Sequence, residues 1–486
     1  MPSQRTDLFP LRGSRGQLAP LLCALLAALS GCTTLSPRSP VLPETPVPAE
    51  WSTQVSSPYA LYAPTAAASL AQWWQRFNDR QLAALVTQAL QVNTDVRTAQ
   101  AALQQSRALR DVKSAGLGPA IDASASARRS QSGSNDPSNS FQAGFDASWE
   151  PDVFGGQHSA LNASEADAQA AEASLANIQV SIAAEVAVTY IELRGLQARL
   201  AIARGNLAAQ SETLQLSRWR AQAGLASSLD VEQAVAASEQ TSAQIPSLQT
   251  SVSQALSSLA VLTGQAPGAL QDSFAAAAAV PQAPADLVLA IPAETLRQRP
   301  DVRAAEHRIS AALARAAQAD AARYPGFQIS GSLGLNALTL GSLTSGASVA
   351  KALLASVSLP LFDGGAARAQ VRAQEAAREQ ARVSYQAAVL TALKDVEDAL
   401  VSLQDNRERL ARLQAAASAA ANADLLARQR YASGLIDFGA VLETQRTLLS
   451  TQDSVASTRA SLSADHVRLY KALGGGWTPA AESAAL

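Results

Sequence analysis

Residue types that carry chemistry in enzymes and metal proteins are scarce in this chain. Among 486 residues there are three histidines, two cysteines and one methionine, and the formal net charge is −2. His158, His307 and His466 are far apart and follow no metal-ligand or nucleophile–base spacing, and a scattered histidine on a helix is usually a surface residue. Glycine-rich phosphate loops and basic clusters are also lacking. The sequence therefore predicts no enzyme, no metal site and no nucleic-acid partner.

Long apolar runs are lacking beyond the N-terminus. No stretch after Cys32 has about 18 consecutive apolar residues, so no transmembrane helix is expected there. The run from Leu18 to Leu29 is too short to cross a bilayer and follows three arginines, which is the form of a secretory signal peptide. We therefore expect residues 1–31 to be removed. Cys23 leaves with them, so the mature chain has one cysteine and no disulfide.

The end of the signal peptide predicts a lipid anchor. Leu29-Ser30-Gly31-Cys32 resembles a bacterial lipobox, in which the cysteine becomes the first residue and carries a covalent N-acyl diglyceride; no other cofactor is expected. Thr33 follows in place of an aspartate, which by the same resemblance favours the outer membrane. The alternative is an ordinary signal peptide with a chance cysteine near its cleavage site. Residues 32–64 contain a proline-rich segment and are expected to form a lipidated tether.

The body of the chain contains an internal sequence repeat. Matching segments are 206 residues apart near the start of the body (299 minus 93) and 210 apart near its end (428 minus 218). A slowly rising offset is typical of two copies that differ by small insertions. We therefore expect two tandem structural repeats, 65–275 and 276–477, followed by a C-terminal tail, 478–486.

Each repeat contains one predicted β-hairpin, at about 120–150 and about 326–362. In the segment "SFQAGFDASWE" the apolar side chains alternate with polar ones, as in a strand with one apolar face. The opposite faces of these strands carry the polar side chains of Asp122, Arg128, Gln142, Asp146, Glu150 and Gln328.

The rest of each repeat is predicted to be helical. Residues 157–223 and 366–433 contain no proline, and helices of this length are on the order of 100 Å long. A heptad seam from Val389 to Leu410 is interrupted at Arg407, and the first copy has the same seam with an interruption at Gln197. This pattern is typical of coiled-coil packing.

Four amphipathic strands in two hairpins leave edges unpaired and apolar faces uncovered. Closure with other copies of the chain removes both problems, and cyclic symmetry is the usual arrangement. Two copies give eight strands and a filled interior, whereas three give twelve strands and a lumen. The alternatives are a soluble α+β domain whose hairpins pack on helices, and a lipid-anchored structural coiled coil without a pore.

Together these motifs resemble one family. "RPDVRAAEHRI", "YPGFQISGSLG", "LPLFDGG" and "RYASGLIDFGAVLETQRTLLS" are similar, in this order, to the outer-membrane factor family, the TolC-like conduits of tripartite efflux pumps, in its NodT-like lipoprotein subgroup. The resemblance extends from about Trp73 to Trp477. It implies an α+β membrane protein and a homotrimer. Its twelve-stranded outer-membrane β-barrel, four strands per chain, would be continuous with a long periplasmic coiled-coil barrel of helices.

The resemblance also implies function. The protein would be a passive conduit in contact with outer-membrane lipid, exporting drugs or toxic solutes with a periplasmic adaptor protein and an inner-membrane pump. A conduit of the same shape could instead serve type I protein secretion or metal export. The identity of the adaptor separates these functions, and the chain does not contain it.

Two glycines are expected at the turns that end the long helices. Gly224 and Gly434 occupy matching positions and fit left-handed turns, and the family resemblance makes these tips adaptor-docking sites. Asp95 and Asp301 also match and are expected to act as helix N-terminal charges.

The family resemblance implies a periplasmic gate near the second turn. Tyr431 precedes this turn, and Glu443 lies nine residues after its glycine, where family members commonly carry an acidic residue. Gly439 stands where a leucine often narrows the opening, so this chain does not repeat that apolar seal. Asp437 is also near the opening. Either acid could form the constriction, or both could be solvated surface acids.

Overall fold

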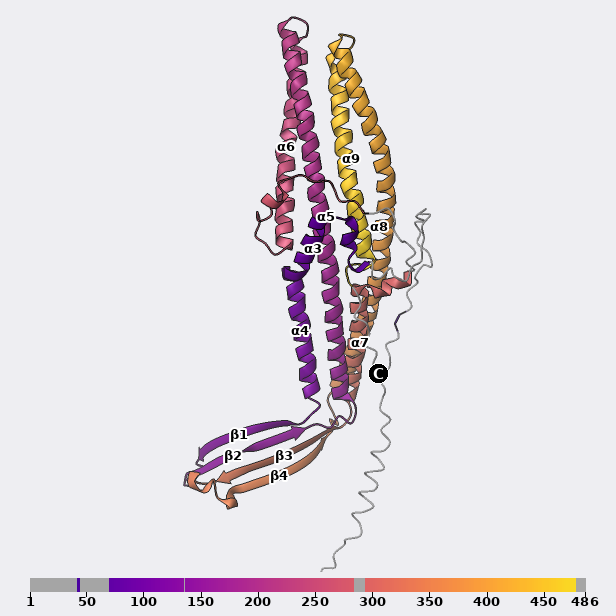
Figure 1. Cartoon of the computed structure of the whole chain (residues 1–486). Coiled ribbons are helices and arrows are strands. Elements are labelled where there is room, and N and C mark those ends of the chain that lie inside the picture. Colours follow the sequence, from indigo (N-terminus) through magenta and orange to yellow (C-terminus); the bar gives the residue numbers. More distant parts are fainter. Residues whose placement is uncertain (1–41, 44–69, 135, 284–292, 478–486) are drawn as a thin grey trace, which may run out of the picture.

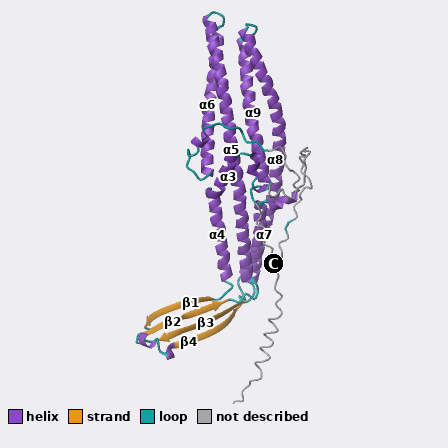
Figure 2. Cartoon of the chain, in the orientation of Figure 1, coloured by secondary structure: helices purple, strands orange, loops and turns teal. Residues whose placement is uncertain are grey.

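A computed structural model describes residues 42–43, 70–134, 136–283 and 293–477. Within these ranges a long helical body ends at one four-stranded sheet (Figures 1 and 2). The signal peptide, Cys32, most of the tether and the C-terminal tail lie outside the described residues. Of the tether, Leu42 packs against the hydrophobic core of the body.

Two helices of 67 residues each run through most of the body, α5 (Gly156–Gln222) and α8 (Ala366–Ala432). Each returns from its turn in a helix of 35 residues, α6 (Ser228–Leu262) and α9 (Phe438–Ala472). On the side toward the sheet lie α4 (Thr94–Ala115) and α7 (Pro300–Ala321), of 22 residues each. The long helices begin and end within one residue of the predicted bounds.

The helical segment between residues 80 and 115 is divided into two helices. α3 (Arg80–Val92) ends at Asn93, and α4 begins directly after it. The Asn93 side chain accepts hydrogen bonds from the backbone N–H groups of Asp95 and Val96, which is a helix N-cap. Asp95 and Asp301 lie in the first turns of α4 and α7, as predicted.

The helices form a layer with two free sides. Beyond the middle, α6 packs on α5, α5 on α9, and α9 on α8. Toward the sheet, α4 packs on α5, α5 on α7, and α7 on α8. Of these long helices, α8 therefore borders one side and α4 and α6 border the other.

The hydrophobic core is concentrated at the middle of the body. The predicted seam lies there: Val396 and Leu403 are buried on α8, as are their counterparts Val186 and Leu193 on α5. Short 3₁₀ helices pack against this region: η1 (Trp73–Phe77), η2 (Asp272–Phe274) and η3 (Ala293–Gln298). The ring of Trp73, which is fully buried, stacks on Tyr470 at a centroid distance of 5.5 Å.

The polar break in the first seam has a structural role. Gln197 is buried and its side-chain amide donates to the Phe274 carbonyl at 2.8 Å. Arg194, one turn earlier, is also buried and donates to the Ala276 carbonyl at 3.1 Å. These bonds attach the segment after α6 to the middle of α5.

Helix α5 contains a window that is long and apolar enough to cross a membrane, judged by length and composition alone. Half of that window is buried within the chain. A core helix passes the same test, and burial against α6, α7 and α9 accounts for the apolar character of α5.

The four strands form one antiparallel sheet in the order β1-β2-β3-β4. Their bounds are Ala120–Ser130, Ser138–Trp149, Gly326–Ala337 and Val349–Ser358. The sequence analysis predicted two hairpins without pairing between them, whereas in the structure β2 pairs with β3 and joins the two hairpins into one sheet. The register aligns Phe145 with Leu333, so the apolar face continues across the junction.

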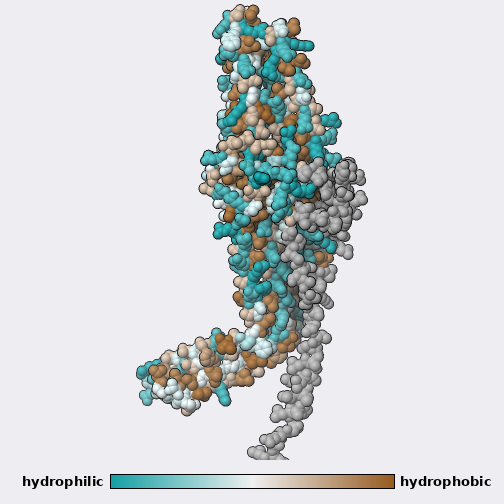
Figure 3. Space-filling view, viewed as in Figure 1, coloured by the Kyte–Doolittle hydropathy of each residue, from teal (hydrophilic) through white to brown (hydrophobic). Residues whose placement is uncertain are grey.

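The second hairpin is shorter than predicted. β4 ends at Ser358 and not at 362, because Pro360 has no N–H to donate to a strand neighbour. Leu361 and Phe362 lie in the following loop and are more than nine-tenths exposed. Apolar side chains are also exposed over the sheet, as Figure 3 shows.

Candidate functional site

The end of the helical body far from the sheet is formed by two tight turns. Gly224 and Gly434 have φ angles of 71° and 74°, a left-handed conformation that favours glycine. The N–H of Leu225 donates to the Arg220 carbonyl at 2.7 Å, and the N–H of Leu435 donates to Arg430 at 2.9 Å. Both glycines are thus the turn formers that the sequence predicted. The leucines that follow them are 71% and 74% exposed.

A small apolar cluster, here called the tip cluster, lies just inside these turns. Its buried members come from α6, α8 and α9: Ala234, Ala237, Ala427, Tyr431, Phe438, Val441 and Leu442. The rings of Tyr431 and Phe438 are 5.3 Å apart. Tyr431, expected at the gate, is therefore a packing residue within this chain, and its side chain is 7% exposed.

Close to the turns, Arg220 links the first helical pair, α5 and α6, to the second pair, α8 and α9. Arg220 of α5 donates a hydrogen bond from Nη1 to the Tyr431 carbonyl at 2.9 Å. Its guanidinium carbon lies 4.4 Å from the centre of the Tyr431 ring, a cation–π distance. Sequence reasoning missed this contact. A signal was present, because Arg220 and Arg430 each lie four residues before a turn glycine.

The acidic candidates differ in what they do. Asp437 is the N-cap of α9, and its Oδ1 accepts the N–H of Ala440 at 2.8 Å. Glu443 is exposed and lies on the same helical stripe as the exposed Gly439. Arg446, three residues after Glu443, is exposed on that stripe too, and the sequence analysis did not single it out.

Buried polar side chains lie below the tip cluster. Gln445 of α9 donates from Nε2 to Thr213 Oγ1 of α5 at 3.0 Å. Asp424 of α8 is almost fully buried and pairs with Arg428. Gln445 Oε1 and Asp424 Oδ1 have no hydrogen-bond partner within the described ranges. Unpaired buried polar groups stabilise packing less than apolar groups do, so this level of the body is less costly to open.

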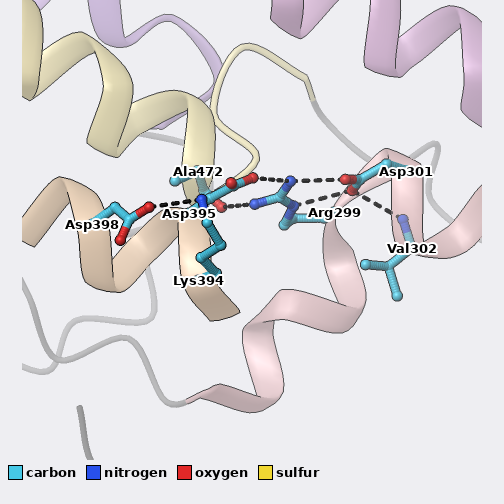
Figure 4. Close-up of polar contacts among 7 residues, drawn as sticks. All are labelled: Arg299, Asp301, Val302, Lys394, Asp395, Asp398 and Ala472. Carbon is cyan, nitrogen blue, oxygen red and sulfur yellow. Dashed lines mark hydrogen bonds and ion pairs between the residues drawn. The ribbon is translucent and has the colours of Figure 1, made fainter. Parts of the chain in front are cut away.

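A second group of polar residues joins three helices at the middle of the body. Figure 4 shows Arg299, the N-cap of α7, between Asp301 and Asp395. Its Nη2 is 2.7 Å from Asp301 Oδ2 and 3.2 Å from Asp395 Oδ2, and Nη1 donates to the Ala472 carbonyl at 2.8 Å. Burial lowers the pKa of Arg299, but the two carboxylates outweigh it and the net pKa is raised. This arginine joins α7, α8 and the end of α9.

His466 corrects the expectation that the histidines are surface residues. It is 4% exposed and lies at the polar break of the second seam. Nδ1 is 2.8 Å from the Leu462 carbonyl and Nε2 is 3.4 Å from Arg407 Nη2, so Nδ1 is the ring donor and Nε2 accepts. Burial lowers the pKa of His466, and Arg407 lowers it further. Within the described ranges no cluster of His, Cys, Asp and Glu is arranged to hold a metal ion.

Comparison with known proteins agrees with this architecture. The family model described as outer membrane efflux protein matches the chain twice, at residues 85–265 and 291–475. The chain is 30% identical to the pyoverdine export outer membrane protein OpmQ of Pseudomonas aeruginosa, over 93% of this chain and 97% of that protein. It is also 30% identical to the toluene efflux pump outer membrane protein TtgF of Pseudomonas putida, over 94% and 96% of the two chains.

A solved structure of the outer-membrane channel OprN superimposes with a TM-score of 0.80 and 34% sequence identity. It covers 90% of this chain and 99% of its own length. The likeness therefore extends over most of the chain. The chain belongs to the outer membrane efflux protein family, and is a passive outer-membrane channel and not an enzyme.

Proposed function

We propose that three copies of this chain form a twelve-stranded barrel in the outer membrane, continuous with a periplasmic barrel of helices. The observation that best supports this assembly is the sheet, in which β1 and β4 each have one edge without a strand partner in the described chain. One face of the sheet is apolar, whereas the other carries Asp122, Gln142 and Asp146. Closure of three sheets would pair the edges and place the polar face around a lumen.

The free sides of the helical body support the same assembly. Residues 413–423 of α8 and 240–262 of α6 carry no charged side chain. The first segment lies 11–21 residues before Gly434, and the second begins 16 residues after Gly224, so they overlap in height along the body. The α8 segment is rich in alanine, and small side chains allow close helix approach. We propose that α8 of one copy packs against α6 of the next.

Disulfide cross-linking tests this assembly. In the pair Ala419→Cys with Ala243→Cys, both positions are exposed on the free sides. Oxidation should give a ladder ending at a covalent trimer, and each single variant serves as the control. Monomers in native mass spectra of the detergent-extracted wild-type protein would contradict the proposal.

We propose that the channel exports small organic molecules, powered by an inner-membrane pump through an adaptor protein. The names of the relatives support this class of cargo, because they specify pyoverdine and toluene. Expression with candidate adaptor–pump pairs in a strain lacking such channels should restore solvent or drug tolerance. Restoration of protein secretion or metal tolerance alone would instead favour the alternative functions.

We propose that the tip is the gate and that Glu443 lines it. Both acids are exposed, but the carboxylate of Asp437 is engaged in capping α9. Three copies of Glu443 around the axis would repel one another and attract cations. The contact between Arg220 and Tyr431 holds the two helical pairs together and opposes opening.

The turns themselves are proposed as the docking sites for the adaptor. Gly224 and Gly434 set two similar turns, and each presents an exposed leucine to solvent, Leu225 and Leu435. Replacement of both leucines by serine should weaken adaptor binding in a pull-down without loss of trimer. Unchanged binding would move the docking site elsewhere.

Two further features remain proposals. Cys32 is proposed to carry the lipid, on the strength of the lipobox resemblance. The two repeats are proposed to derive from duplication, which is supported by helix pairs of equal length and by two matches to one family model.

A further inference from the structure

Two basic residues interrupt the apolar face of the sheet. The strand register places Ile121, Phe145 and Leu333 on this face, together with Leu353. Because strand side chains alternate, Arg129 of β1 shares the face of Ile121, eight residues earlier. On β4, Lys351 pairs directly with Leu333 and so lies on this face as well.

Both basic residues are in the half of the sheet that lies away from the helices. Arg129 is the tenth of eleven residues in β1, which runs outward from α4. Lys351 is the third of ten residues in β4, which runs back toward α8. Both are exposed, and neither makes an ion pair or a side-chain hydrogen bond within the described ranges.

The carboxylates of the sheet do not neutralise these charges. Asp122 and Asp146 pair in the register with each other and lie on the opposite, polar face. The same face carries Arg128, the neighbour of Arg129. The apolar face of the strands thus has a net positive charge, confined to one end.

A basic side chain facing lipid is costly in the middle of a membrane and much less so near its rim. Lysine and arginine lay their aliphatic stems along apolar surface and place the charged group at the headgroup level. Guanidinium and ammonium groups bind phosphate well, and arginine does so with two parallel hydrogen bonds. The position of these residues therefore suits an anionic headgroup at the outer rim.

We propose that Arg129 and Lys351 form a binding site for the phosphate groups of an anionic lipid in the outer leaflet. The proposal depends on the trimeric barrel, in which β4 of one copy lies beside β1 of the next. Each junction then brings Lys351 of one copy and Arg129 of its neighbour onto adjacent strands. A trimer has three such sites, located where the copies meet.

Native mass spectrometry of the trimer tests the site. The purified protein is mixed with a bisphosphorylated lipid A and, separately, with its dephosphorylated form, and bound lipids are counted on the trimer peak. The double variant Arg129→Gln, Lys351→Gln should retain the phosphorylated lipid far less well, by about fivefold for each basic side chain removed. The matched control is Arg128→Gln, which changes the adjacent residue on the other face and should retain lipid like the wild type.

The proposal would be overturned by equal retention of the lipid in the double variant, by equal loss in the Arg128→Gln control, or by equal retention of the dephosphorylated lipid. Displacement of the lipid by millimolar inorganic phosphate would show a general phosphate site and would also overturn it. The mass of the protein peak tests the trimeric barrel separately from the lipid site. A monomer peak in the wild type contradicts the barrel, whereas a trimer without selective lipid contradicts only this site.

Discussion

The contact between Arg220 and Tyr431 predicts how firmly the tip is held. Arg220→Met removes the hydrogen bond to the Tyr431 carbonyl and the cation–π contact with its ring, while retaining an unbranched side chain of similar length. We expect the two helical pairs of each chain to separate more readily. The channel should therefore open more often.

The structure allows a rough magnitude. A hydrogen bond from a charged donor contributes about 1.5–3 kcal/mol, and an exposed cation–π contact about 0.5–1 kcal/mol. Arg220 is half-buried, so the lower ends of both ranges apply, and their sum is about 2 kcal/mol per chain. At about 1.4 kcal/mol per tenfold, this corresponds to an increase of about 30-fold in the ratio of separated to joined tips.

Single-channel recording in planar bilayers measures this ratio through the open fraction. Arg220→Lys retains the charge but loses the planar group, so it should fall between wild type and Arg220→Met. The matched control is Arg218→Met, an exposed position two residues earlier on the same helix. If Arg220→Met and Arg218→Met trimers have the same open fraction, the contact does not restrain the tip and the reasoning is wrong.

Three further predictions concern the gate, the anchor and the buried histidine. Glu443→Gln should weaken the block of the channel by divalent cations in bilayer recordings. Asp437→Asn should leave this block unchanged, and asparagine preserves the helix cap. The reverse result would assign the constriction to Asp437. Cys32→Ala should give an unlipidated but still trimeric protein in native mass spectra, and loss of the trimer would show that lipidation is needed for assembly. Because the pKa of His466 is lowered on folding, its stabilising contribution is present above its unfolded pKa, about 6.5, and is lost as the pH falls through the folded pKa. Acid destabilisation measured by thermal melts should therefore lessen in His466→Gln, and an unchanged pH profile would contradict this account.

Local patterns in the sequence were sufficient for most of the elements. Proline-free segments with an apolar seam gave the long helices, and alternation gave the strands. Gly224 and Gly434 were identifiable because only a left-handed turn explains glycine at matching positions between two helical segments. At Asn93 the helical periodicity continues through a cap residue, so a break there was hidden by an uninterrupted pattern.

Contacts between segments that are distant in the sequence could not be predicted from local patterns. Arg220 and Tyr431 are separated by 211 residues, and their meeting depends on how α5 and α8 are rotated about their axes. The burial of His466 has the same cause. It depends on which face of α9 packs against α8, and no sequence motif around the histidine indicates that face. The union of the two hairpins follows from the register between β2 and β3, which neither hairpin contains alone.

The distribution of packing supports the proposed position of the gate, which is the tip and not the middle of the body. At the middle, a large core that includes Trp73 and Tyr470 is closed by Arg299, which binds two carboxylates and a helix end. At the tip the cluster is small, three of its members are alanines, and the level below it contains buried polar atoms without partners in the described chain. Regions with few apolar contacts open at lower free energy than the core. The proposed opening of the tip would therefore leave the packing at the middle of the body undisturbed, and the wall of the conduit would be maintained there.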